Sequence, residues 1–118
     1  MPQESKDYGR IVNEEAFHRL AALINHEQVI IGGNSDECGL YIEPTVVNAD
    51  SFDDKTMQDE IFGPILPVLT YYNIEEVIIN LRKRPKPLAL YVFSEDKKLE
   101  WRIIKEVSVS YTHIRAHE

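Results

Sequence analysis

The sequence is poor in cysteine, and it lacks any long hydrophobic run. Its 118 residues include one cysteine, Cys38, which excludes a disulfide within the chain and fits a reducing compartment. No apolar stretch approaches the roughly 20 residues that a membrane helix needs. Residues 1–7 are polar and of mixed charge, without the features of a secretory signal. We therefore expect no export, no membrane segment and a cytoplasmic location.

Basic residues are also scarce. The chain has 13 Lys and Arg against 20 Asp and Glu, which gives a formal charge of -7. Phosphate binding needs clustered cations, and the single basic cluster in the sequence is Arg82-Lys83-Arg84 with Lys86. Its position after an amphipathic stretch is typical of cations at a helix C-terminus. We expect no nucleic-acid partner.

The length allows one modest domain, which is small for an enzyme that binds both a dinucleotide and a second substrate. Helical spacing of apolar residues predicts three helices, capped by Asn13, Asn73 and Asp96. Four segments have strand character: residues 28–31, 40–47, 65–72 and 88–93. The alternation of strands and helices favours an α/β layer fold with a largely parallel sheet.

Few residues suggest a catalytic or metal site. Asp36 and Glu37 disfavour a thiolate at Cys38, so we interpret this cysteine as incidental. We expect no metal site, because the histidines lack a convincing third ligand: His18, His26, His113 and His117. The Gly32-Gly33 pair lacks the G-x-G-x-x-G spacing of a dinucleotide loop and predicts a turn.

The segment Glu60-Ile61-Phe62-Gly63-Pro64 joins an acid, an aromatic and a rigid turn before a strand. Gly63 permits unusual backbone conformations, and Pro64 restricts both itself and its predecessor. A carboxylate accepts hydrogen bonds from two sugar hydroxyls, and a neighbouring ring packs against a flat heterocycle. The pair therefore suits a nucleoside. From the residues alone, an exposed Glu60 and a core Phe62 are the commoner interpretation.

Four segments occur together in the order and approximate spacing of one family. They are DYGRIVN at 7–13, YIEPTV at 41–46, QDEIFGP at 58–64 and KPLALYVFS at 86–94. Over residues 7–107 the chain resembles the aldehyde dehydrogenase superfamily, closest to its class 3 or fatty aldehyde dehydrogenase-like branch. The resemblance implies a C-terminal part of the catalytic domain, which is a three-layer α/β fold with a largely parallel sheet.

The resemblance also implies a function. In that family the glutamate of the EIFGP segment holds the nicotinamide ribose and the phenylalanine packs beside the nicotinamide, which gives these roles to Glu60 and Phe62. The enzymes oxidise aldehydes to carboxylic acids with NAD or NADP, and we expect a homo-oligomer at full length. Their nucleophilic cysteine and general-base glutamate correspond to positions before Met1, and Cys38 matches neither. We expect this chain alone to be inactive.

Residues 108–118 depart from the family pattern and resemble a translated sequencing adapter, so we divide the chain into a family part, 1–107, and a non-family tail. Two other functions stay open. The chain could be a non-catalytic interaction module that pairs with aldehyde dehydrogenase subunits, or it could derive from an acyl-CoA-forming or phosphorylating relative.

Overall fold

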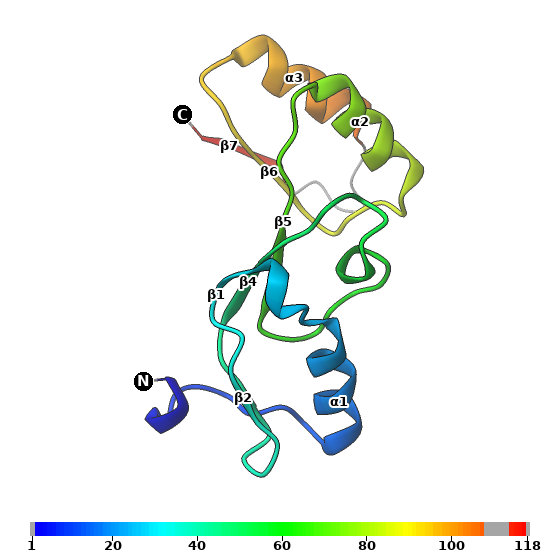
Figure 1. The fold of residues 1–118 in the computed structure, drawn as a ribbon. Coiled ribbons are helices and arrows are strands. Elements are labelled where there is room, and N and C mark those ends of the chain that lie inside the picture. The colour runs from blue at the N-terminus through cyan, green and yellow to red at the C-terminus, as the bar shows by residue number, and fades with distance from the viewer. Residues whose placement is uncertain (1, 108–113, 118) are drawn as a thin grey trace. The chain divides into compact units, whose positions relative to one another are not determined.

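The computed structural model describes residues 2–107 and the backbone of residues 114–117 (Figure 1). The chain forms two compact units, Met1–Thr70 and Tyr71–Glu118. The helices are α1 (Glu14–Leu23), α2 (Ile74–Lys83) and α3 (Lys97–Glu106), and the 3-10 helices are η1 (Pro2–Glu4), η2 (His26–Gln28) and η3 (Lys55–Met57). The strands are β1 (Val29–Ile31), β2 (Ser35–Asp36), β3 (Tyr41–Ile42), β4 (Thr45–Asn48), β5 (Ile65–Val68), β6 (Leu90–Phe93) and β7 (Ile114–His117).

The three predicted helix caps are confirmed. Asn13, Asn73 and Asp96 each accept hydrogen bonds from backbone N–H groups in the first turn of the helix that follows. Asp96 accepts two, from Lys98 at 3.0 Å and from Leu99 at 3.2 Å. These bonds satisfy N–H groups that have no partner inside the helix, and they fix where each helix begins.

The sheet of the first unit is mixed, which corrects the expectation of a largely parallel sheet. Its strand order is β1-β4-β5, with β4 antiparallel to β1 and parallel to β5, and β2 pairs with β3 in a separate antiparallel hairpin. The chain between β1 and β4 forms the β2–β3 hairpin and contains no helix of the kind that usually connects parallel strands, and β4 returns antiparallel to β1. The longer connection from β4 to β5, which contains η3, permits the parallel pair. The α/β class itself is confirmed.

Two turns shape this sheet. The predicted strand over residues 40–47 is interrupted at Glu43 and Pro44, as a proline within a strand favours. Gly32 follows β1 with a left-handed φ of 84°, and a Cβ there would lie 2.2 Å from the Pro44 carbonyl oxygen. The backbone therefore approaches Gly32 too closely for any side chain.

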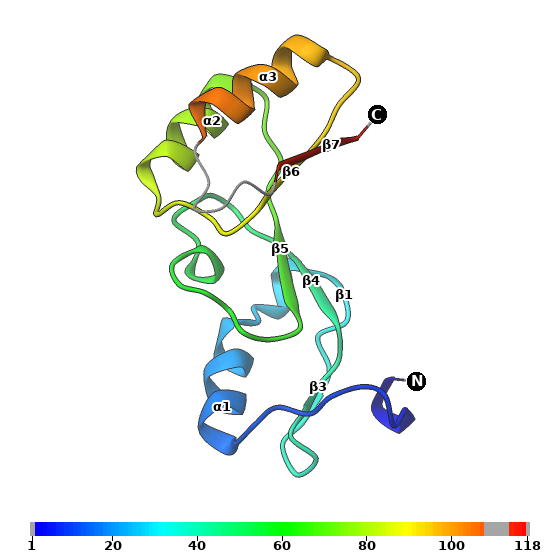
Figure 2. The same ribbon diagram turned by 180° about the vertical axis from the view of Figure 1, so that it is seen from behind.

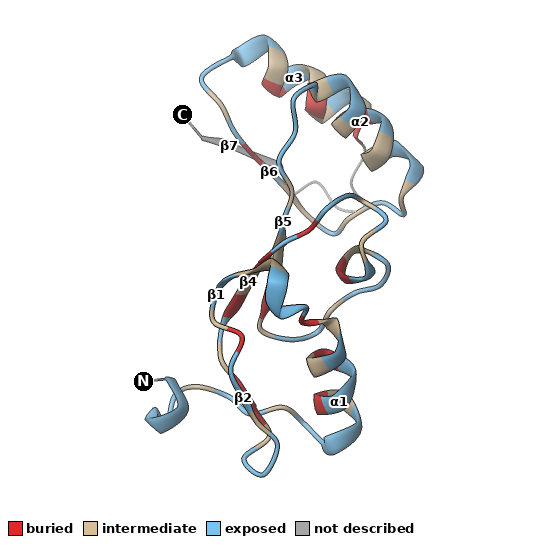
Figure 3. Ribbon diagram, viewed as in Figure 1, coloured by how far each residue is buried: buried red, intermediate tan, exposed pale blue. Residues whose placement is uncertain are grey.

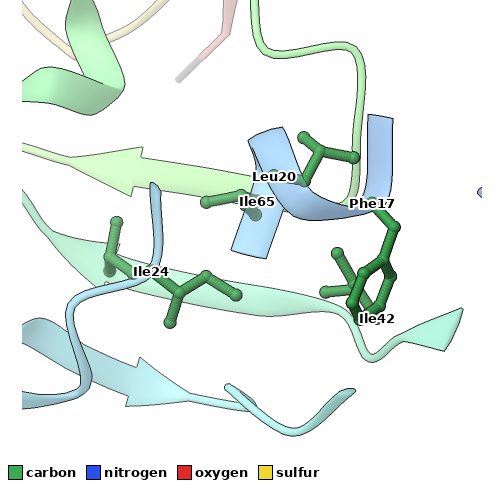
Figure 4. Close-up of a cluster of buried hydrophobic side chains, with 6 residues drawn as sticks. Phe17, Leu20, Ile24, Ile42 and Ile65 are labelled. Atoms are coloured by element: carbon green, nitrogen blue, oxygen red, sulfur yellow. The ribbon is translucent and has the colours of Figure 1, made fainter. Parts of the chain in front are cut away.

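Helix α1 forms the core of the first unit by packing against the strands, as Figure 4 shows. The buried side chains in this cluster are Phe17, Leu20, Ile24, Ile42, Val47 and Ile65. Leu20 has no exposed surface at all, and its position between helix and sheet determines what can lie beside it. Figure 3 shows the buried positions of the helix and the strands in red.

The second unit has its own core, formed by Ile78 of α2, Val92 of β6, and Ile103 and Val107 from α3 and its C-terminal cap. Helices α2 and α3 lie side by side in both Figure 1 and Figure 2. Strand β6 pairs in parallel with β7. This unit therefore keeps a parallel strand pair with helices packed against it.

Candidate functional site

The site segment, residues 60–64, lies directly before β5 and is fixed to the first unit at several points. The carbonyl oxygen of Ile61 accepts a hydrogen bond from Nη2 of Arg19 at 2.9 Å. The carbonyl oxygen of Pro64 accepts one from the backbone N–H of Thr45 at 2.8 Å. The Ile61 side chain packs against the hydrophobic core. Backbone bonds and core packing thus hold the segment from both ends.

Gly63 lies against the core. A Cβ at this position would lie 2.5 Å from Cδ2 and 2.8 Å from Cδ1 of Leu20, which is fully buried. Sequence reasoning assigned Gly63 an unusual backbone conformation, but its φ is not left-handed. The glycine is required for close packing, and the left-handed residue is the one before it.

Phe62 has a φ of 51° and is 77% exposed. A left-handed φ is uncommon for a bulky residue and costs about 1–3 kcal/mol, so it persists only where the surroundings hold it. The interpretation of Phe62 as a core residue is wrong. The structure instead presents an aromatic ring to solvent from a constrained backbone, which is a feature of ligand sites more than of folding.

Glu60 is exposed, and no described residue donates a hydrogen bond to its carboxylate. Together with Phe62 it borders a pocket of about 410 Å³, whose other lining residues are Arg19, Leu23, Lys55 and Asp59. A carboxylate with free acceptor positions beside an exposed ring fits a nucleoside, through its sugar hydroxyls and its flat base. The geometry brings the two predicted site residues together.

The two cations of this pocket were missed by the sequence analysis. Arg19 binds the Ile61 carbonyl, and Nζ of Lys55 donates to the carbonyl oxygen of Ala22 at 2.9 Å. Each therefore connects α1 to a later segment. Arg19 lies 42 residues before its partner in the chain, so no local pattern could reveal the contact.

Among the residues that the structure describes, the other candidates do not line the pocket of Glu60 and Phe62. Cys38 is exposed in the turn between β2 and β3, and His18 lies 3.4 Å from the carboxylate of Glu37. Within residues 2–107 no group of three potential ligands could hold a metal ion. The side chains of His113 and His117 lie outside the described residues. No described helix has the length and apolar character to cross a membrane.

Comparison with known sequences identifies relatives. The sequence model of the aldehyde dehydrogenase family matches residues 2–118. The chain is 52% identical over 108 residues to the 4,4'-diaponeurosporen-aldehyde dehydrogenase of Staphylococcus aureus, covering 90% of this chain and 24% of that protein. It is 44% identical over 107 residues to aldehyde dehydrogenase family 3 member B1 of Bos taurus, covering 91% and 23% respectively.

The solved structures that this chain resembles are also aldehyde dehydrogenases. The substrate-bound state of Staphylococcus aureus AldH matches 98% of this chain and 25% of its own, with a TM-score of 0.84 and 46% identity. Aldehyde dehydrogenase C of Pseudomonas syringae, solved with NAD+ and octanal, matches 93% and 24%, with a TM-score of 0.74 and 26% identity.

The chain spans about a quarter of the length of the curated relatives that it matches. The family match includes the predicted non-family tail, of which residues 108–113 and 118 lie outside the described residues, so the boundary at residue 107 stays a prediction. The predicted resemblance itself is confirmed, because family 3 members are among the relatives. The chain belongs to the aldehyde dehydrogenase family.

Proposed function

We propose that this chain is the C-terminal part of the catalytic domain of an NAD(P)-dependent aldehyde dehydrogenase that oxidises aldehydes to carboxylic acids. The family match and the quarter-length coverage support the assignment to part of such an enzyme. In the intact enzyme the chain contributes to a three-layer catalytic domain. Its sheet then continues into strands of the remaining three quarters.

The exposed pair of Glu60 and Phe62 is the observation that carries the proposed role of this part. The Glu60 carboxylate accepts hydrogen bonds from the hydroxyls of the nicotinamide ribose, since no described residue occupies its oxygens. Phe62 packs beside the nicotinamide ring, which its exposure permits. The cofactor, NAD or NADP, supplies the hydride acceptor, and these two residues set its position.

Other enzyme parts supply the nucleophile and the base. Cys38 is exposed between β2 and β3, next to the acidic Glu37, and it does not line the pocket of Glu60 and Phe62. We therefore propose that the chain positions the cofactor without performing the chemistry, and that it is inactive alone. The homo-oligomer and the cytoplasmic location stay predictions.

A chimeric enzyme tests this function. The segment of the Staphylococcus aureus relative that aligns with residues 7–107 is replaced by those residues, a change that 52% identity makes conservative. We expect aldehyde-dependent reduction of NAD(P). Glu60→Gln should lower kcat/KM for the cofactor roughly 10- to 100-fold, because a misplaced nicotinamide slows the reaction.

The matched control is Glu27→Gln, which changes an exposed carboxylate of the same unit outside the pocket. It should leave the kinetic constants unchanged. An active chimera in which Glu60→Gln and Glu27→Gln behave alike would remove Glu60 from the cofactor site.

One structural observation favours the non-catalytic interaction module as a second function. Strand β6 exposes two large aromatic side chains, Tyr91 at 54% and Phe93 at 74%, and such apolar surface is typical of a face that another protein covers. We propose that the occupant in this case is an intact aldehyde dehydrogenase subunit. Co-purification of this chain with the Staphylococcus aureus relative would support the module, and separate elution of both proteins would reject it.

A further inference from the structure

We propose that Arg19 is a positioning residue of the cofactor site, holding the backbone beside Phe62 so that the ring faces the nicotinamide; this inference rests on the proposed function. Arg19 also lines the pocket of Glu60 and Phe62, but we assign it no contact with the substrate or the cofactor. It acts on Phe62 through the carbonyl group of Ile61, with which it forms a 2.9 Å hydrogen bond.

Two consecutive residues of α1 contact the site segment. Arg19 binds the residue before Phe62, and Leu20 packs against Gly63, the residue after it. Helix α1 therefore holds the segment on both sides of Phe62, by a hydrogen bond to Ile61 and by apolar packing against Gly63. Because Leu20 is fully buried in the core, the helix that provides both contacts is a rigid support.

The residue between the two contacts has the strained backbone. The backbone of Phe62 lies in the left-handed region at a φ of 51°. A residue with a bulky side chain adopts this conformation only where its surroundings hold it there. Release of the Ile61 carbonyl would free the peptide unit before Phe62. The backbone would then relax toward ordinary dihedral angles, and the ring would point in another direction.

The hydrogen bond is exposed, which separates positioning from folding. Water replaces Arg19 as a donor to the Ile61 carbonyl at little cost in stability, since an exposed carbonyl stays solvated. Water does not fix the direction of the peptide unit as α1 does. Loss of Arg19 should therefore affect cofactor binding more than the stability of the unit.

The test uses the chimera described above with Arg19→Met and Arg19→Lys. Arg19→Met should raise KM for NAD(P) about tenfold through misplacement of the ring, with KM for the aldehyde unchanged and the melting temperature within about 4 °C. Arg19→Lys should recover most of the affinity, because an ammonium group also donates to a carbonyl. Arg82→Met, an exposed arginine of α2, is the matched control and should change nothing.

A double-mutant cycle shows whether Arg19 acts through Phe62. If it does, Arg19→Met should change KM for NAD(P) less than about twofold in a Phe62→Ala background, because coupled residues are not additive. A merely structural arginine would instead lower the melting temperature in both backgrounds and give an additive loss.

The outcomes separate the inference from the function on which it rests. No effect of Glu60→Gln and Phe62→Ala on the cofactor would reject the proposed function. A clear effect of those two variants, with Arg19→Met unchanged in KM or additive with Phe62→Ala, would reject the role of Arg19 alone. An Arg19→Met protein that does not fold would also reject it, because it would make the arginine structural.

Discussion

Adjacent residues of the site segment differ in what their side chains meet. A Cβ on Gly63 would meet the buried Leu20, whereas the Phe62 side chain is exposed and stands on a left-handed backbone. The contrast indicates that the packing of Gly63 against the core helps to hold the Phe62 side chain in its exposed position. It also explains why a glycine occupies position 63 in this chain, because any side chain there would meet the fully buried Leu20.

Replacement of Gly63 by alanine tests this packing. The added Cβ would lie 2.5 Å from Cδ2 of Leu20, and overpacking of this kind costs about 1–3 kcal/mol in unfolding free energy. Urea unfolding of the 118-residue chain measures the loss. Gly9→Ala is the control, because no atom lies within 4 Å of its added Cβ, and it should change stability by less than about 0.5 kcal/mol. Equal stability of the two variants would contradict the packing argument.

The elements differ in how far the sequence predicts them. Helices begin where Asn13, Asn73 and Asp96 cap them, because a capping bond joins residues two or three apart. Strand direction was predicted less well, since it depends on the length and content of the connections between strands. The sheet is mixed because the chain between β1 and β4 forms the β2–β3 hairpin and β4 returns antiparallel to β1. The alternation of elements in the sequence did not reveal this return.

The site shows the same limit. Glu60 and Phe62 were predicted because a short motif and a family resemblance mark them. Arg19 was not, because its contact with Ile61 spans 42 residues and an arginine on an exposed helix face carries no local signal. Sequence reasoning thus named the two residues that we propose face the cofactor, and it missed the arginine that we propose holds their backbone.

The 3-10 helix η3 gives an element-scale prediction on pH. Asp54 caps this helix, because its carboxylate accepts a hydrogen bond from the backbone N–H of Thr56 at 3.0 Å. This bond, together with bonds from the Thr56 hydroxyl and the Gln28 amide, lowers the pKa of Asp54. A lowered pKa means that the unfolded chain takes up the proton first as pH falls.

The contribution of Asp54 is therefore complete above its unfolded pKa of about 3.9, and it is lost as pH falls from there through the folded pKa. We expect Asp54→Asn to be less stable than the parent at pH 6, with a smaller loss of stability on acidification below about pH 4. Urea unfolding across this range measures both. Parallel pH curves for the two proteins would show that Asp54 contributes nothing through its charge.

At the scale of the whole molecule, the chain holds two units with separate cores and about a quarter of the length of its relatives. The proposed cofactor segment in one unit and the exposed aromatic side chains of β6 in the other fit a part that other segments of an enzyme complete. The proposed nucleophile and base belong to those other segments.

The isolated chain should therefore form no NADH from NAD+ and an aldehyde. The control is Cys38→Ala, which removes the chain's single cysteine. Both proteins should give the background rate in a sensitive absorbance assay. Aldehyde-dependent NADH formation by the parent above the level of Cys38→Ala would show that the chain carries its own nucleophile.

The most direct test of the proposed cofactor role is the single-turnover rate of hydride transfer in the chimera. With saturating NAD(P), Glu60→Gln should slow this step about tenfold, through loss of nicotinamide position. A deuterated aldehyde should then show a larger isotope effect than in the parent, while Glu27→Gln should match the parent in both measurements. Equal transfer rates and equal cofactor affinities for Glu60→Gln and Glu27→Gln would contradict the assignment of this segment to the cofactor.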